Sequence, residues 1–203
     1  MKKFFLLLFC MMLIDQWIFA QEEDPTEEKG FKKENFFTGG SVSLSFFNQS
    51  FLIGVNPVFG YSLAKWVDLG LVVNYSYASY RDYSVFDDRL KQSIYGGGLF
   101  TRLFPVHFIF AQAQVEHNWI RVKYLPPNNG PSIVDDVSAN SFLVGAGYTT
   151  GRDKYNKTVY GYLAVLFDLS NNTNSPYTDN AGRSIPIIRA GINIPLFQGR
   201  GDR

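Results

Sequence analysis

From Ser41 to Phe46 a serine alternates with a large apolar residue at every step. Successive side chains of a β-strand point to opposite faces, so a period of two predicts a strand with one polar face and one apolar face. After residue 36 the sequence shows no helical period, and further segments with the β-like period follow, separated by turn residues. The eight expected strands lie near residues 37–47, 50–63, 67–81, 91–104, 108–121, 137–149, 158–169 and 184–197.

The links between these segments alternate in length after a tight first link at Asn48 and Gln49. The shorter links are residues 64–66, 105–107 and 150–157. The longer links are residues 82–90, 122–136 and 170–183. An even number of strands with short turns at one end and long loops at the other is the connectivity of an outer-membrane barrel. We therefore expect an all-β fold, an antiparallel up-and-down transmembrane β-barrel of eight strands with both termini in the periplasm.

The distribution of lysine indicates which face lies inside. The ten lysines all lie before the first strand, in turns or at strand margins: Lys2, Lys3, Lys29, Lys32, Lys33, Lys65, Lys91, Lys123, Lys154 and Lys157. A solvated outer face has no reason to exclude lysine, whereas a confined interior does, because an unpaired buried charge costs far more than a hydrogen-bonded serine or glutamine. We therefore expect the polar face to line the lumen.

The other face carries no charge in any strand centre, as a bilayer requires. Aromatic residues suited to two interfacial girdles lie toward its ends: Tyr61, Trp66, Tyr75, Tyr77, Phe104, Phe108, Trp119 and Tyr148. This pattern favours an apolar face against lipid. The alternatives are a soluble β-sandwich with one shielded face and a soluble ligand-binding barrel.

The first twenty residues have the composition of a signal peptide. Lys2 and Lys3 are followed by an apolar run over 4–14 and a plausible cleavage site at 18–20. That run is short against the ~20 residues of a membrane-spanning helix, which is the alternative reading. The expected organisation is a signal peptide at 1–20, a flexible charged periplasmic tail at 21–35, the barrel at 36–199 and a C-terminal tail at 200–203.

Several stretches carry a family resemblance: NPVFGYSL (56–63), SIYGGGLFTR (93–102), SFLVGAGY (141–148), NSPY (174–177) and IIRAGINIPLF (187–197). In this order they resemble the small, porin-like outer-membrane β-barrel proteins of Bacteroidetes-type bacteria, which are similar to eight-stranded enterobacterial barrels. The resemblance implies outer-membrane lipid, lipopolysaccharide and the barrel assembly machinery as partners. Such barrels end on an aromatic residue that the machinery reads. Phe197 would be that residue, although six residues follow it here.

Polar residues on the inward face are expected to form a network in the lumen: Asp68, Arg102, Gln112, Gln114, Glu116, Asp168 and Arg189. We expect Asp68 to pair with Arg102 on the neighbouring strand, and Arg189 to be neutralised by Glu116 or Asp168. Eight strands enclose a lumen that side chains just fill. The network is therefore interpreted as a structural plug, with a path for protons or ions as the alternative.

The long loops are where a binding function could lie. Four aromatic residues there are expected to be exposed and able to contact an extracellular partner or a lipopolysaccharide sugar: Tyr83, Phe86, Tyr124 and Tyr177.

Other classes of function have little support in the sequence. A formal charge of +1 without a basic cluster argues against nucleic-acid binding. Two histidines, and no cysteine beyond Cys10, offer no metal-ligand spacing and no cofactor site. His117 has no serine placed as in outer-membrane lipid hydrolases, so we expect no catalytic residues. The leading hypothesis is a structural or surface-interaction role; the alternatives are a narrow channel or transport-associated barrel and a lipid-modifying enzyme.

Overall fold

The computed structural model describes residues 31–47, 50–82, 84–127, 130–152, 158–179 and 182–198. The expected signal peptide and the C-terminal tail at 200–203 lie outside this part of the chain. The described elements are a short 3-10 helix η1 (Lys33–Asn35) and the strands β1 (Phe36–Phe47), β2 (Ser50–Ala64), β3 (Val67–Arg81), β4 (Arg89–Val106), β5 (Ile109–Leu125), β6 (Ile133–Thr149), β7 (Tyr160–Asp168) and β8 (Ile187–Pro195). Over these residues, no helix has the length and apolar character needed to cross a membrane.

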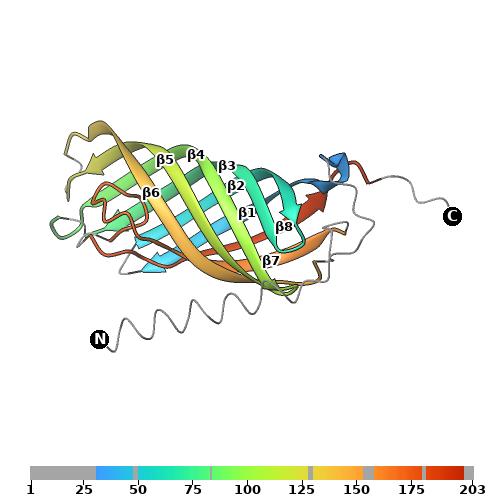
Figure 1. The fold of residues 1–203 in the computed structure, drawn as a ribbon. Coiled ribbons are helices and arrows are strands. Elements are labelled where there is room, and N and C mark those ends of the chain that lie inside the picture. The colour runs from blue at the N-terminus through green and yellow to red at the C-terminus, as the bar shows by residue number, and fades with distance from the viewer. Residues whose placement is uncertain are drawn as a thin grey trace, which may run out of the picture. The chain divides into compact units, whose positions relative to one another are not determined.

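The eight strands form one closed antiparallel barrel (Figure 1). Each strand pairs with the next in the sequence, and β1 pairs with β8 from Phe37 opposite Pro195 to Leu44 opposite Ile188. Closing the ring in this way pairs every strand on both sides around the barrel, although β6 before Leu143 extends beyond the end of β7. The prediction of an all-β, antiparallel, up-and-down barrel of eight strands is confirmed.

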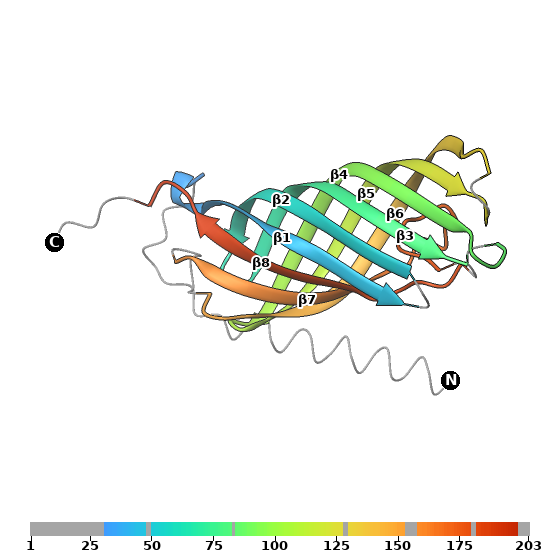
Figure 2. The same cartoon turned by 180° about the vertical axis from the view of Figure 1, so that it is seen from behind.

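The two ends of the barrel differ in the length of their connections (Figure 2). Links 65–66 and 107–108 are tight turns at the end where β1 begins and β8 finishes, which we call the short-turn end, while link 150–159 at the same end is longer. At the other, long-loop end, the connection between β5 and β6 differs from the prediction. It covers only 126–132, because both strands continue in register until Tyr124 lies opposite Ile133. The flanking residues were expected in a loop but pair with each other as strand residues.

Side chains alternate between the interior and the exterior, most regularly in β3 and β7. Along β3 from Leu69 to Tyr75 the exposed residues are apolar, and Leu71 is 55% exposed while its neighbour Val72 is 3% exposed. The serines of β1 are buried, whereas Val42 and Phe46 on the same strand are exposed. The polar face of β1 is therefore the inner face, and the exterior is a continuous apolar belt.

The interior contains apolar layers as well as polar ones. An apolar cluster around Leu52, Ile94 and Leu143 fills the long-loop end, and aromatic rings fill the short-turn end. Phe104, expected in the outer girdle, is one of these inner rings and packs against Phe110 at 5.5 Å between ring centres. The prediction for Phe104 was wrong, because the two-residue period of β4 carries Phe100, Arg102 and Phe104 to the same inner face.

The first described residues are held against the barrel rather than forming part of a free tail. The backbone N–H of Lys32 donates to the Tyr61 hydroxyl at 3.1 Å, and Asn35 Nδ2 donates to the Ser62 carbonyl at 3.0 Å. Gln198 Nε2 reaches the Glu34 carbonyl at 2.8 Å from the other end of the chain. Residues 32–35, expected in the flexible tail, thus belong to the short-turn end of the barrel.

Phe197 lies beyond the last strand. Strand β8 ends at Pro195, and the Phe197 ring is 64% exposed and meets Phe36 edge-on at 6.4 Å. Recognition of Phe197 by the assembly machinery stays a prediction.

Candidate functional site

A buried ion pair occupies the centre of the lumen. Strand β5 points Gln112, Gln114 and Glu116 inward at every second residue, and β8 supplies Arg189 from across the barrel. Arg189 Nη2 lies 3.1 Å from Glu116 Oε1, with the two side chains 3% and 0% exposed. Arg189 Nη1 also donates to Gln114 Oε1 at 3.0 Å, and Gln112 Nε2 donates to the same oxygen at 2.8 Å. Of the two expected partners of Arg189, the structure brings Glu116 to it.

The connection between β7 and β8 reaches into this ion pair. Tyr177 lies in that loop and donates its hydroxyl to Glu116 Oε2 at 2.8 Å. Burial, and then the charge of Glu116, raise the pKa of Tyr177 well above its ordinary value, so the hydroxyl stays protonated and can donate. Tyr177 is 1% exposed. The expectation that it is an exposed contact residue was wrong, because the loop folds back into the barrel mouth.

Asp168 organises the same loop instead of neutralising Arg189. It is the last residue of β7, and its Oδ1 accepts the backbone N–H groups of Phe142 at 3.0 Å and Ser170 at 2.9 Å. Its Oδ2 accepts the hydroxyl of Ser175 at 2.5 Å. Because these bonds link the loop to β6 and β7, Asp168 fixes the loop in the lumen.

The charge pair at the short-turn end differs from the expected one. Asp68 and Arg102 lie opposite each other in the register of β3 and β4, but Asp68 Oδ1 pairs with Arg152 Nη2 at 2.8 Å. Arg152 comes from the connection between β6 and β7, is 3% exposed, and stacks 3.9 Å from the ring centre of Phe104. The sequence prediction missed Arg152, which reaches the lumen from a turn.

Arg102 finds other partners. Its Nε donates to Gln112 Oε1 at 2.9 Å and its Nη1 to Asn193 Oδ1 at 3.3 Å. The guanidinium also lies 4.3 Å from the ring centre of Tyr162, a cation–π contact. Arg102 thereby joins the aromatic cluster of the short-turn end to the central polar residues.

The aromatic loop residues predicted to contact a partner differ in how exposed they are. Phe86 is 87% exposed in the connection between β3 and β4. Tyr124 is half-buried, and its hydroxyl donates to Asp88 Oδ2 at 3.0 Å. Tyr83 lies outside the described residues. Phe86 is therefore the exposed ring among the three that the structure describes.

The described part of the chain contains no cluster of metal-ligating side chains. No three His, Cys, Asp or Glu side chains gather there in a way that could hold a metal ion. His117 lies on the exterior, with its Nδ1 2.7 Å from Asn140 Oδ1 and its ring 4.7 Å from that of Trp119. The partners of His117 are thus an amide and an aromatic ring rather than a hydroxyl nucleophile.

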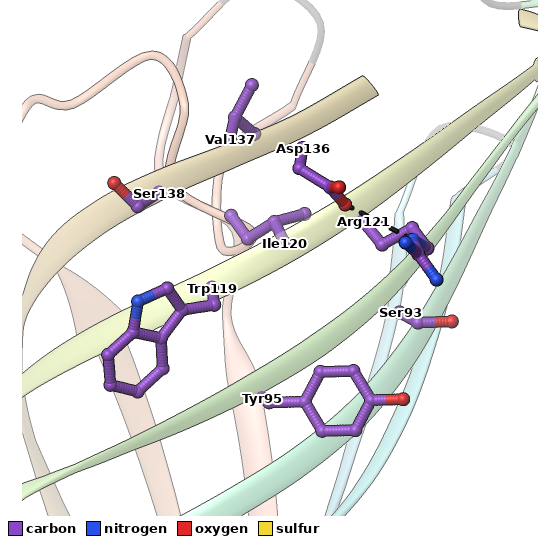
Figure 3. Close-up of a pocket in the computed structure, with 8 residues that line it drawn as sticks. All are labelled: Ser93, Tyr95, Trp119, Ile120, Arg121, Asp136, Val137 and Ser138. Atoms are coloured by element: carbon purple, nitrogen blue, oxygen red, sulfur yellow. Dashed lines mark hydrogen bonds and ion pairs between the residues drawn. The ribbon is translucent and has the colours of Figure 1, made fainter. Parts of the chain in front are cut away.

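The exterior is hollowed at the long-loop end of β4, β5 and β6 (Figure 3). This hollow has a volume of about 630 Å³ and is lined by Ser93, Tyr95, Trp119, Ile120, Arg121, Asp136, Val137 and Ser138. Arg121 Nε lies 3.2 Å from Asp136 Oδ1 across it. The lining thus includes two aromatic residues, Tyr95 and Trp119, and the charged pair of Arg121 and Asp136.

Fold and interior together define a small closed β-barrel with an apolar outer belt and buried polar and aromatic side chains in its lumen. Comparison with protein-family models gives no match, and neither does comparison with curated proteins. Among solved structures the chain is similar to neighbours that are eight-stranded outer-membrane β-barrels.

Three of these structures illustrate the extent of the similarity. Neisserial surface protein A is 11% identical, with 80% of this chain and 97% of that chain covered and a TM-score of 0.46. The attachment invasion locus protein Ail of Yersinia pestis is 9% identical, with 78% and 96% covered and a TM-score of 0.46. The N-terminal β-barrel domain of Pseudomonas aeruginosa OprF is 13% identical, with 79% and 96% covered and a TM-score of 0.34. The resemblance to Bacteroidetes-type barrels stays a prediction from the sequence.

Proposed function

We propose that the protein is an integral barrel of a bacterial outer membrane. The observation that carries this proposal is the apolar belt, on which Leu71, Val73 and Leu99 are each more than half exposed in the middle of their strands. A water-soluble protein rarely exposes a contiguous apolar surface of this extent, because its contact with water is unfavourable. In a bilayer the same surface contacts lipid, and the closed ring satisfies the backbone hydrogen bonds.

The proposed topology places the short-turn end in the periplasm and the long loops outside the cell. Residues 1–20 would be removed on export, and the barrel assembly machinery would insert the chain. This orientation follows the general pattern of outer-membrane barrels, whose periplasmic turns are short and whose extracellular loops are longer.

The proposed role is non-enzymatic: structural support of the membrane, or interaction with a partner at the long-loop end. The lumen supports this role over transport. Arg189, Arg102 and Asp68 are each under 4% exposed, and the loop bearing Tyr177 occupies one mouth of the barrel. A filled lumen leaves the outer surface and the loop tips, such as that bearing Phe86, for interactions.

A charge placed on the belt tests the membrane assignment. Leu71→Arg is expected to destabilise the barrel in lipid bilayers by about 2–4 kcal/mol, the cost of a basic side chain near the bilayer midplane. Ser138→Arg, also outward but near the long-loop end of β6 and opposite Trp119, is the control and is expected to cost at most about 1 kcal/mol. Urea unfolding in liposomes measures both. Equal and negligible effects would indicate a water-exposed surface, since surface substitutions in water usually change stability by less than ~0.5 kcal/mol.

Conductance separates the proposed role from that of a narrow channel. The refolded protein in a planar bilayer is expected to give no stable current steps, because side chains block the lumen. Regular steps that scale with salt concentration would instead identify a channel. A protein that stays folded and monodisperse in buffer without detergent would contradict the membrane assignment itself.

A further inference from the structure

Basic side chains are concentrated on the outer face of β3, β4 and β5, just beyond the apolar belt at the long-loop end. They are Arg81, Arg89, Lys91, Arg121 and Lys123, and we call them the basic ladder. Two pairs within it face each other directly across neighbouring strands: Arg81 lies opposite Arg89, and Lys91 lies opposite Lys123. Like charges in directly opposed positions repel each other and destabilise a sheet. The barrel thus carries an electrostatic cost at one place on its surface.

Carboxylates of the protein do little to offset this cost. Arg121 pairs with Asp136, but both side chains are more than two-thirds exposed, and such ion pairs contribute little. Throughout the described ranges, no ion pair joins Arg81, Lys91 or Lys123 to a carboxylate. Arg81, Lys91 and Lys123 therefore present positive charge to whatever surrounds the barrel, with Asp87 as the carboxylate that lines the same hollow as Lys91.

The ladder lies at the height of lipid headgroups if the belt lies in the bilayer. Tyr95 and Trp119 face each other across β4 and β5 and are 53% and 59% exposed, as residues of an interfacial girdle would be. Arg121 is two residues further along the strand than Trp119. At roughly 3.3 Å per residue and a tilt of about 45°, it stands some ~5 Å higher. The positive charges begin where the hydrocarbon ends.

The shape of the surface suits a headgroup at this point. The hollow of about 630 Å³ lies directly between the girdle and the ladder. In Figure 3 the hydroxyls of Tyr95 and Ser93 point to the same side of the hollow as the Arg121 guanidinium. Hydroxyl donors beside a guanidinium are complementary to phosphate oxygens, and the ring of Trp119 is complementary to the apolar part of a lipid.

We propose that the basic ladder and the adjoining hollow form a binding site for the phosphate groups of an outer-leaflet lipid of the lipopolysaccharide class. This inference rests on the proposed membrane location and adds a specific ligand site to it. Arg121 supplies a planar donor for phosphate oxygens, and Lys91 and Lys123 supply flexible point charges. Phosphate binding would also relieve the repulsion between the opposed lysines.

The test uses the barrel without its signal peptide, refolded in zwitterionic micelles. Two tryptophans then remain, Trp66 and Trp119, so Trp66→Phe leaves Trp119 beside the hollow as a single fluorescent reporter. Purified lipopolysaccharide and its enzymatically dephosphorylated form are titrated in parallel. We expect the phosphorylated lipid to bind at least about tenfold more tightly, because charge-assisted hydrogen bonds to phosphate are the stronger ones.

Two variants with opposite expected signs make the assignment specific. Lys91→Gln with Lys123→Gln is expected to weaken binding roughly thirtyfold, the combined effect of two basic residues near an anionic surface. Asp136→Asn is expected to tighten binding a few-fold, because it removes the carboxylate that competes for Arg121. Lys33→Gln, an exposed lysine at the short-turn end, is the matched control and should leave the affinity unchanged.

Three results would overturn the proposal: equal affinity for the two lipids, a double lysine variant that binds like the parent, or an Asp136→Asn variant that binds more weakly. Inorganic phosphate added as competitor distinguishes the source of the phosphate. Displacement at concentrations similar to those of the lipid would assign the site to a soluble anion and overturn the lipid assignment. Each titration is made on protein whose detergent-dependent folding has first been verified, so a failure of the membrane assignment is seen separately.

Discussion

Arg189→Ala is expected to lower the free energy of unfolding of the barrel by about 3–5 kcal/mol, the usual cost of removing one partner of a buried ion pair. The reason lies in the carboxylate that remains. Glu116 has a fully buried side chain and would lose the guanidinium group at 3.1 Å. Gln114, which accepts a second bond from Arg189, would lose part of its support as well. Urea titration in micelles, followed by heat-modifiable gel mobility, measures the change.

Two comparisons separate the ion pair from a general effect of removing arginine. Arg121→Ala removes an arginine whose ion pair is exposed, so at most about 1 kcal/mol is expected. Glu116→Gln combined with Arg189→Met removes both buried charges and is expected to recover most of the lost stability, because neither partner is left uncompensated. If Arg189→Ala unfolded at the same urea concentration as Arg121→Ala, the central ion pair would not hold the lumen together.

The architecture was accessible from the sequence because its signal is local. Alternation between Ser43 and its apolar neighbours, repeated over eight segments, specifies which side chains share a face without any knowledge of distant contacts. The limits of β5 and β6 were not accessible in the same way. Pro126, Pro127 and Gly130 suggested a loop beginning near residue 122, yet Val122 and Val137 keep the period and pack on the apolar cluster at the long-loop end. Tertiary packing extends these strands up to the prolines.

The composition of the lumen was predictable, but its pairings were only partly so. Register places Arg102 opposite Asp68. Register predicts only contacts between adjacent strands. The actual partner of Asp68 is Arg152, which enters from a turn and approaches across the lumen. Such contacts depend on the width of the closed barrel and on side chains from non-adjacent segments, and neither is encoded in a local period. The same reason applies to the burial of Tyr177.

Tyr177→Ala is the second substitution with a large expected effect, about 3–5 kcal/mol by analogy with truncation of other buried aromatic residues. The ring packs in the apolar cluster with Ile187 and Leu143, and the hydroxyl bonds to Glu116. Losing both is expected to release the loop between β7 and β8 from the barrel mouth. Arg183 lies in that loop and offers a trypsin site, so the rate of cleavage there in the folded barrel reports the release.

Tyr177→Phe is the matched control because it keeps the ring and removes only the hydroxyl. Its expected cost is about 1.5–3 kcal/mol, that of a hydrogen bond to a charged group. When loop opening is fast relative to cleavage, the rate follows the population of the open form, so Tyr177→Ala should be cleaved at least several hundredfold faster than the parent, at roughly tenfold per 1.4 kcal/mol. Tyr177→Phe should fall between the two. If the phenylalanine variant were cleaved as fast as the alanine variant, the bond to Glu116 alone would retain the loop. If all three proteins were cleaved at one rate, the mouth of the barrel would be closed without help from Tyr177.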